Sequence, residues 1–88
     1  MKNWWRIMIE LGENPLSRDT WGIDRIKEVY ADQYAEGYIF RTNVVKKDVE
    51  KCRQKCEDEG LEVFVGERAF ISDGTEFPHY STILVREK

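Results

Sequence analysis

The chain has 88 residues, of which 41% are hydrophobic and 12% aromatic, and its 14 basic and 17 acidic side chains give a formal net charge of −3. This length predicts a single domain over residues 1–88, and the apolar content excludes a disordered chain. The slight acidic excess removes the broad positive field that accompanies most nucleic-acid binding, so such binding would need a local basic patch. The opening residues resemble neither a signal peptide nor a membrane span, and two cysteines make no disulfide framework, so we expect a cytoplasmic protein with free thiols.

The first predicted element is a strand over residues 5–11, where apolar side chains alternate and give one strongly apolar face. Trp4 and Met8 lie on the other face, which is therefore less polar than a solvated strand face usually is. The sequence Gly-Glu-Asn-Pro at residues 12–15 ends this strand.

A helix is predicted next over Trp21–Glu36. Ile23, Ile26 and Tyr30 recur at helical spacing within it, and Gly37 supplies a terminator. The alternative for the same stretch is a hairpin, because residues 26–30 followed by Gly-Tyr also fit two short strands.

A strand over Tyr38–Thr42 precedes the second predicted helix, which runs from Asn43 to Gly60. Asn43 is expected to cap this helix and Gly60 to end it. Four side chains recur at spacings of four, three and four, which places them on one core-facing stripe. They are Val45, Val49, Cys52 and Cys56.

Two further strands complete the expected fold. Alternating side chains predict a strand over Leu61–Ile71, the residues Ser72–Thr75 form a strong turn signal, and Tyr80–Glu87 follows as the last strand. The order is β-α-β-α-β-β. We therefore expect an α+β domain with a single-layer, four-stranded mixed sheet and two helices on one of its faces.

Cys52, Cys56 and His79 are the residues that could bind zinc or carry out catalysis. Structural zinc sites usually have four ligands, often from closely spaced Cys-x-x-Cys pairs, and this chain has two cysteines one helical turn apart and a single histidine. We interpret the cysteines as small buried hydrophobic residues and His79 as a solvated loop residue. No catalytic set, metal site or cofactor site is predicted.

Basic residues gather where the second predicted helix begins. The candidates for anion or nucleic-acid binding are Arg41, Asn43, Lys46 and Lys47, which would surround the free N–H groups of that helix end. The alternative is that they are solvated charges that interact with acidic side chains four residues away. The acidic run at residues 57–59 could similarly bind a basic partner or a cation.

An apolar sheet face is the clearest hint of a partner. If helices cover only one face, the other would expose an apolar patch, and such a patch usually indicates an interface. Its expected members are Trp4, Met8, Ile39 and Phe64.

The order of elements resembles the Alba family of small nucleic-acid-binding proteins and the C-terminal domain of a bacterial translation initiation factor. Local sequences similar to those of Alba proteins are Gly-Glu-Asn-Pro at 12–15, Val-Gly at 65–66, Asp-Gly at 73–74 and Ser-Thr-Ile at 81–83. Alba proteins have paired lysines where this chain has Glu13 and Asn14. The resemblance therefore implies the topology and a tendency to dimerise, but not the nucleic-acid contact.

Three hypotheses follow. The favoured one is a non-enzymatic binding or regulatory domain that contacts a protein partner, or a second copy of itself, through the open sheet face. The alternative is a nucleic-acid or phosphate-ligand module at the start of the second helix. The third is a small enzyme that uses His79 or the thiols. No membrane association is expected.

Overall fold

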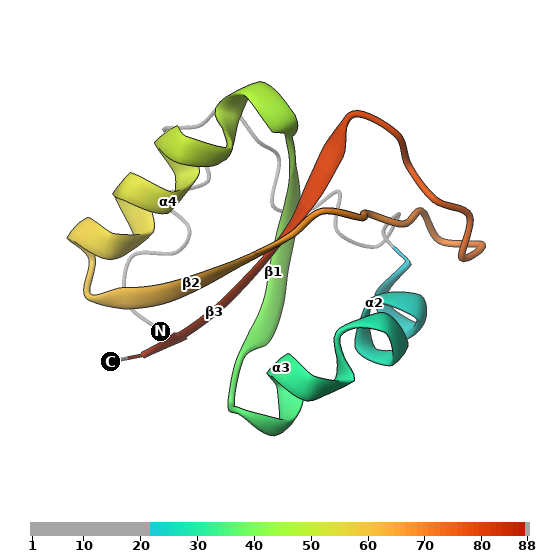
Figure 1. Cartoon of the computed structure of the whole chain (residues 1–88), viewed down its shortest axis with the longest axis horizontal. Helices are drawn as coiled ribbons and strands as arrows, with labels where there is room; N and C mark the ends of the chain where they lie inside the picture. Colours follow the sequence, from blue (N-terminus) through green and yellow to red (C-terminus); the bar gives the residue numbers. More distant parts are fainter. Residues whose placement is uncertain (1–21, 88) are drawn as a thin grey trace.

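The computed structural model describes residues 22–87, and the predicted first strand, with Trp4 and Met8, lies outside them. Along the described chain two short helices precede the first strand, and two strands follow the longest helix (Figure 1). They are α2 (Ile23–Val29), α3 (Ala31–Ala35), β1 (Ile39–Val45), the 3₁₀ turn η2 (Lys46–Asp48), α4 (Val49–Asp58), β2 (Leu61–Gly66) and β3 (Tyr80–Glu87). None of the helices in residues 22–87 is long and apolar enough to span a membrane.

Within residues 22–87 the sheet has three strands in the order β1-β3-β2, and β3 pairs antiparallel with both neighbours. The prediction of an α+β fold is confirmed, but the prediction of a four-stranded sheet with the order β-α-β-α-β-β is wrong. The last strand inserts between β1 and β2 instead of extending an edge. Residues 81–85 of β3 are all buried, so the most buried of the three strands takes the central place, where both of its backbone edges are hydrogen-bonded.

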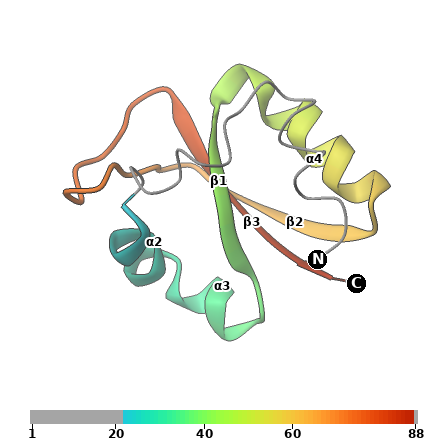
Figure 2. The ribbon, with the colours of Figure 1, turned by 180° about the vertical axis from the view of Figure 1, so that it is seen from behind.

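The helices cover opposite faces of this sheet, which corrects the prediction that both lie on one face (Figures 1 and 2). Successive residues of β3 alternate between the two sides. Ile83 and Val85 belong to the core under α4, whereas Leu84 belongs to the core under α2. Because β3 is apolar on both faces, each face requires its own helical cover.

The predicted helix over residues 21–36 is two short helices in the structure. Tyr30, between α2 and α3, has φ −108° and ψ 34°, outside the α-helical region. Gly37, with φ +96°, follows α3 as expected, and the hairpin alternative is wrong. The break coincides with the residue whose ring packs against Gly66 of β2.

The second helix begins later than predicted. Asn43 is a buried residue of β1 and not a helix cap, because β1 continues its pairing with β3 as far as Val45. Gly60, with φ +81°, lies just after α4 as expected. Cys52 and Cys56 are fully buried against the sheet, which confirms the predicted core-facing stripe for these two residues.

A loop over residues 67–79 joins β2 to β3, so β2 is shorter than the strand predicted as far as Ile71. A backbone bridge between Phe70 and Glu76 closes the loop, and the predicted turn at residues 72–75 is present. The N–H of Gly22 donates to the carbonyl oxygen of Phe70 at 2.7 Å. This bond fastens the start of α2 to the loop.

Candidate functional site

The position of α2 is determined by a tyrosine ring seated on a glycine of β2. A Cβ atom at Gly66 would overlap the Tyr30 ring, so only glycine allows this close approach. The Tyr30 ring also meets the Phe64 ring edge-on, with centroids 6.1 Å apart. These contacts leave Tyr30 only 8% exposed.

Buried hydrogen bonds connect Tyr30 to the sheet and to the 67–79 loop. The Tyr30 hydroxyl donates to the Arg68 carbonyl oxygen at 2.7 Å and accepts from the Arg68 N–H at 3.0 Å. Thr82 Oγ1 lies 2.8 Å from the same carbonyl oxygen and 2.9 Å from Asn43 Oδ1, and its single proton serves one of them at a time. Burial raises the pKa of Tyr30, and this outweighs the backbone hydrogen bond at Arg68, which lowers it.

A second cluster holds the loop against α2 nearer to the surface. The guanidinium carbons of Arg25 and Arg68 lie 5.7 Å and 5.2 Å from the centroid of the Phe70 ring, a cation–π arrangement. Arg25 is ion-paired with Glu28, and Arg68 with Glu76 at 2.9 Å. Phe70 is therefore only 1% exposed although it lies in a loop.

Between α2 and the loop is a cavity of about 440 Å³. Its walls come from the first turns of α2 and from the turn at residues 72–74, two segments about fifty residues apart in the chain. The charged side chains that line it are Asp24, Arg25, Glu28 and Asp73. Asp73 Oδ1 accepts the Thr75 N–H at 2.8 Å, and hydrogen bonds with Thr75 lower the pKa of the Asp73 carboxyl group.

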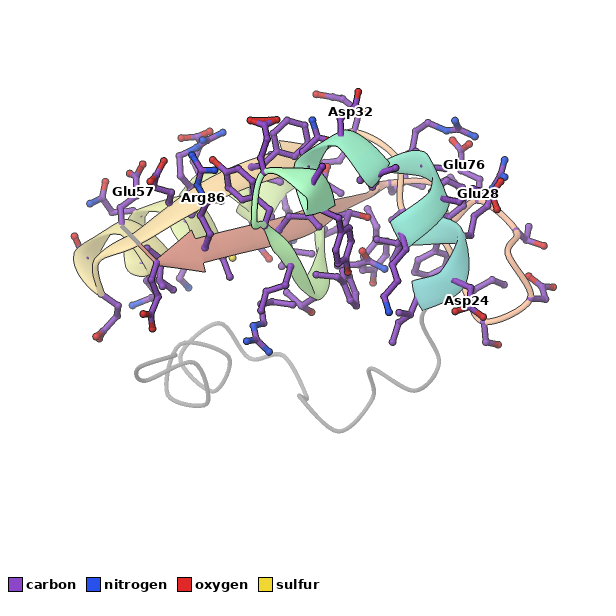
Figure 3. The ribbon with its side chains drawn as sticks, turned by 90° about the horizontal axis from the view of Figure 1, so that it is seen from below. Asp24, Glu28, Asp32, Glu57, Glu76 and Arg86 are labelled. Carbon is purple, nitrogen blue, oxygen red and sulfur yellow. The ribbon has the colours of Figure 1, made fainter. Side chains whose placement is uncertain are left out.

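Exposed carboxylates continue from this cavity along α2 and α3. They recur every four residues, which places Asp24 and Glu28 on one side of α2, while Asp32 lies on α3 and Glu36 directly follows it, beyond the break at Tyr30. They are Asp24, Glu28, Asp32 and Glu36, and we call them the acidic row. Figure 3 shows Asp24, Glu28 and Asp32 projecting outward from α2 and α3, with Glu57 at the opposite end of the molecule. Asp24 and Asp32 have no ion-pair partner among residues 22–87.

The predicted apolar patch does not lie on one face. Ile39 pairs with Val85 and so faces the α4 side, whereas Phe64 pairs with Leu84 and faces the α2 side. Phe64 is partly buried beneath Tyr30, and Ile39, at 37% exposure, is the sole exposed large hydrophobic residue in the described part of the chain. The other two predicted members, Trp4 and Met8, lie outside the described residues.

The four predicted anion-binding residues also diverge. Asn43 is fully buried and shares the α2 face with Thr82. Lys46 reaches instead toward Ser81 on the α4 face, Lys47 is exposed, and Arg41 lies at a register shift of β1. The side-chain nitrogen of Asn43 has no hydrogen-bond partner within the described residues. It is enclosed in the core and is not directed toward the helix start.

The thiols and the histidine are separated. A hydrogen bond from Cys52 lowers the pKa of the Cys56 thiol, against burial, which raises it. His79 is exposed with φ +69°, and its carbonyl oxygen accepts the Lys46 N–H at 3.0 Å. Within residues 22–87 no three His, Cys, Asp or Glu side chains are grouped so that they could hold a metal ion.

No known protein family matches this chain, and neither a curated protein nor a solved structure matches it. Sequence reasoning missed the acidic row, although its four-residue spacing was a visible signal. The cavity beside it had no local signal, because its second wall comes from the distant loop.

Proposed function

We propose that this domain is a non-enzymatic binding module that holds a protein partner through basic side chains of that partner. The observation that carries this proposal is the acidic row on α2 and α3, which leads into the cavity beside α2. Three carboxylates line that cavity, together with Arg25, which is ion-paired with Glu28. A lysine or arginine side chain is the complement of such a surface in charge and in its capacity to donate several hydrogen bonds.

The rigid support of α2 favours recognition over a merely solvated surface. Tyr30 on Gly66 and Phe70 between two guanidinium groups hold the helix and the loop in a fixed relation. A carboxylate surface that does not have to be ordered upon binding loses less of its interaction free energy to conformational entropy. Among residues 22–87, Glu28 is the one of the four carboxylates that has an ion-pair partner, Arg25.

The proposal keeps the expected function, a non-enzymatic binding domain, but moves the binding surface from the open sheet face to the acidic row. A role for the open sheet face would require Phe64 to be accessible, and the Tyr30 and Tyr38 rings pack against it with centroids 6.1 Å away in each case. The nucleic-acid alternative would require Asn43 to act beside Lys47 at the surface, and Asn43 is buried. Neither alternative has a surface comparable to the acidic row within the described residues.

The test is a titration of the isotope-labelled full chain with a hexalysine peptide at low salt, followed by amide chemical shifts. We expect saturable shifts along α2, α3 and residues 72–74, with an affinity that falls as salt is raised because exposed charges are screened. In the triple variant Asp24→Asn, Glu28→Gln, Asp32→Asn, binding should weaken by about tenfold or more.

The matched control is Glu57→Gln, Asp58→Asn, Glu59→Gln. It removes the same three negative charges, from the far end of α4. If only net charge mattered, the two triple variants would weaken binding equally, and the proposal would be rejected. Shifts concentrated around residues 57–59 would reject it as well.

A further inference from the structure

A second cavity, of about 230 Å³, lies on the α4 face of the sheet, where η2, α4, β2 and β3 meet. Its lining combines a lysine, a buried serine, two valines and two peripheral glutamates. The residues are Lys46, Val49, Glu50, Val65, Glu67 and Ser81. It shares no residue with the acidic row or with the cavity beside α2.

The polar groups of this cavity are held in place by the backbone. The Lys46 ammonium donates to the Glu67 carbonyl oxygen at 2.8 Å and to Ser81 Oγ at 3.3 Å. Ser81 is only 3% exposed, and its hydroxyl oxygen accepts from Lys46, which leaves the hydroxyl proton to donate to another group. An ammonium and a hydroxyl proton thus lie side by side, and both are donors to an incoming oxygen.

The other walls are apolar. Val49 of α4 and Val65 of β2 are partly buried and pack against the aliphatic core beneath α4. Two convergent donors above two valines suit a ligand with an anionic oxygen pair at one end and a small aliphatic group at the other. The cavity has room for a branched aliphatic side chain beside the carboxylate.

Two glutamates border the cavity and have to be accounted for. Glu50 is 82% exposed and interacts with Arg53 at 3.4 Å, so the Arg53 charge partly offsets its own. Glu67 is 90% exposed and its carboxylate lies 3.7 Å from the Lys46 ammonium, a weak exposed pair. A ligand carboxylate can displace the Glu67 side chain while the Glu67 carbonyl oxygen continues to hold Lys46.

We propose that this cavity binds a carboxylate that carries a short aliphatic group, with the Lys46 ammonium and the Ser81 hydroxyl donating to the carboxylate. The same chemistry comes from two sources: a free branched-chain acid, or the C-terminal residue of a peptide that ends in valine or leucine. This inference is independent of the acidic row and uses different probes.

The test compares three probes by amide chemical shifts of the full chain: isovalerate, a tetrapeptide ending in valine with a free carboxylate, and the same peptide with an amidated end. We expect saturable shifts at Lys46, Val65 and Ser81 with the two acids and none with the amide. Tighter binding of the peptide than of isovalerate identifies a chain terminus as the ligand, and the reverse identifies the free acid.

Ser81→Ala and Lys46→Gln should each weaken binding by about tenfold, equivalent to roughly 1.4 kcal/mol. The matched control is Lys47→Gln, which removes the same charge from the neighbouring exposed residue and should leave binding unchanged. Equal weakening by Lys46→Gln and Lys47→Gln would reduce the effect to general attraction and overturn the proposal. So would equal binding of the amidated peptide, or the absence of saturable shifts with both acids. Unchanged spectra of the unliganded variants show that each is folded.

Discussion

The α4 face of the sheet is aliphatic, whereas the α2 face is aromatic and contains buried hydrogen bonds. Under α4, the buried residues are Val44, Cys52, Cys56, Leu61, Ile83 and Val85. Under α2, Ile26, Tyr30, Phe70 and Leu84 are buried beside a polar network that includes Thr82 and Asn43. Both cores share the strand β3, whose residues alternate between them.

This difference separates two ways of holding a helix. Aliphatic burial stabilises the fold by an amount that depends mainly on the area removed from water, and it tolerates replacements that conserve volume. Hydrogen bonds and ring contacts depend on direction and distance, so they fix where α2 lies relative to the loop. The proposed acidic surface begins on α2, the helix whose position is fixed by hydrogen bonds and ring contacts.

The most damaging test of this comparison is Gly66→Ala. The new Cβ would overlap the Tyr30 ring, and we expect a loss of about 3 kcal/mol in the free energy of unfolding, measured by urea denaturation. Gly74→Ala is the matched control, since Gly74 has φ +86° but a Cβ atom there would meet nothing within 4 Å, and it should cost about 1 kcal/mol. Equal losses would show that the contact between the Tyr30 ring and Gly66 adds nothing to the usual cost of replacing a glycine.

Tyr30→Phe sharpens the comparison by removing the hydroxyl alone. The hydroxyl makes two hydrogen bonds with the Arg68 backbone, so its loss should cost about 2 kcal/mol at neutral pH. Because burial raises the pKa of Tyr30 above its ordinary value of 10.0, the folded state resists ionisation that the unfolded chain allows. This contribution to stability is present below about pH 10 and is lost as the pH rises through the folded-state pKa.

The measurement is urea denaturation between pH 8 and pH 11 for the wild type and for Tyr30→Phe. The wild type should lose stability more steeply above about pH 10 than Tyr30→Phe does. Tyr34→Phe, from the neighbouring helix, is the control for a tyrosine hydroxyl that only accepts a bond from the Phe40 N–H. Parallel pH profiles for the wild type and Tyr30→Phe would contradict the assignment.

How much of this arrangement could be predicted from the sequence depends on whether the information is local. The bounds of β3, the glycines after α3 and α4 and the burial of the two cysteines follow from periodicity and turn chemistry within a few residues. The insertion of β3 between β1 and β2 does not, because an apolar strand can lie at an edge or at the centre and only tertiary pairing decides.

Residues whose position differs from the prediction are also those whose environment is set by distant parts of the chain. Asn43 looks like a helix cap in isolation, but the pairing of β1 with β3 extends past it as far as Val45. Ile39 and Phe64 were placed together because strand register cannot be read from either strand alone. The break at Tyr30 depends on Gly66 and Arg68, more than thirty residues further along. The acidic row was readable from its spacing, whereas the cavity next to it required the loop.

Reciprocal exchanges on β3 test the comparison within one strand. Thr82→Val removes a buried hydroxyl from the α2 face, and Val85→Thr introduces one on the aliphatic α4 face. Valine and threonine side chains have nearly the same size. We expect each to lower the free energy of unfolding by about 1–2 kcal/mol, because the first leaves a carbonyl or amide oxygen without a donor and the second buries a hydroxyl among apolar groups. A neutral Thr82→Val, in the same urea denaturation experiment, would show that the network does not contribute to stability.

Asp73 provides the smallest expected effect and tests whether directional contacts extend to the surface of the loop. Hydrogen bonds with Thr75 lower the pKa of the Asp73 carboxyl group, so its contribution to stability is present above the unfolded-state pKa and is lost as the pH falls through the folded-state pKa. Asp73→Asn keeps an oxygen that can accept the Thr75 N–H and removes the carboxyl group that titrates.

The measurement is thermal unfolding from pH 6 to pH 2, in which the melting temperature should decline slightly less steeply for Asp73→Asn than for the wild type. Asp32→Asn, an exposed carboxylate of α3, is the control and should leave the profile closer to that of the wild type. A decline that is identical for the wild type and Asp73→Asn would limit the directional contacts to the buried network around Tyr30, and the turn that forms the second wall of the cavity would then be held by its backbone alone.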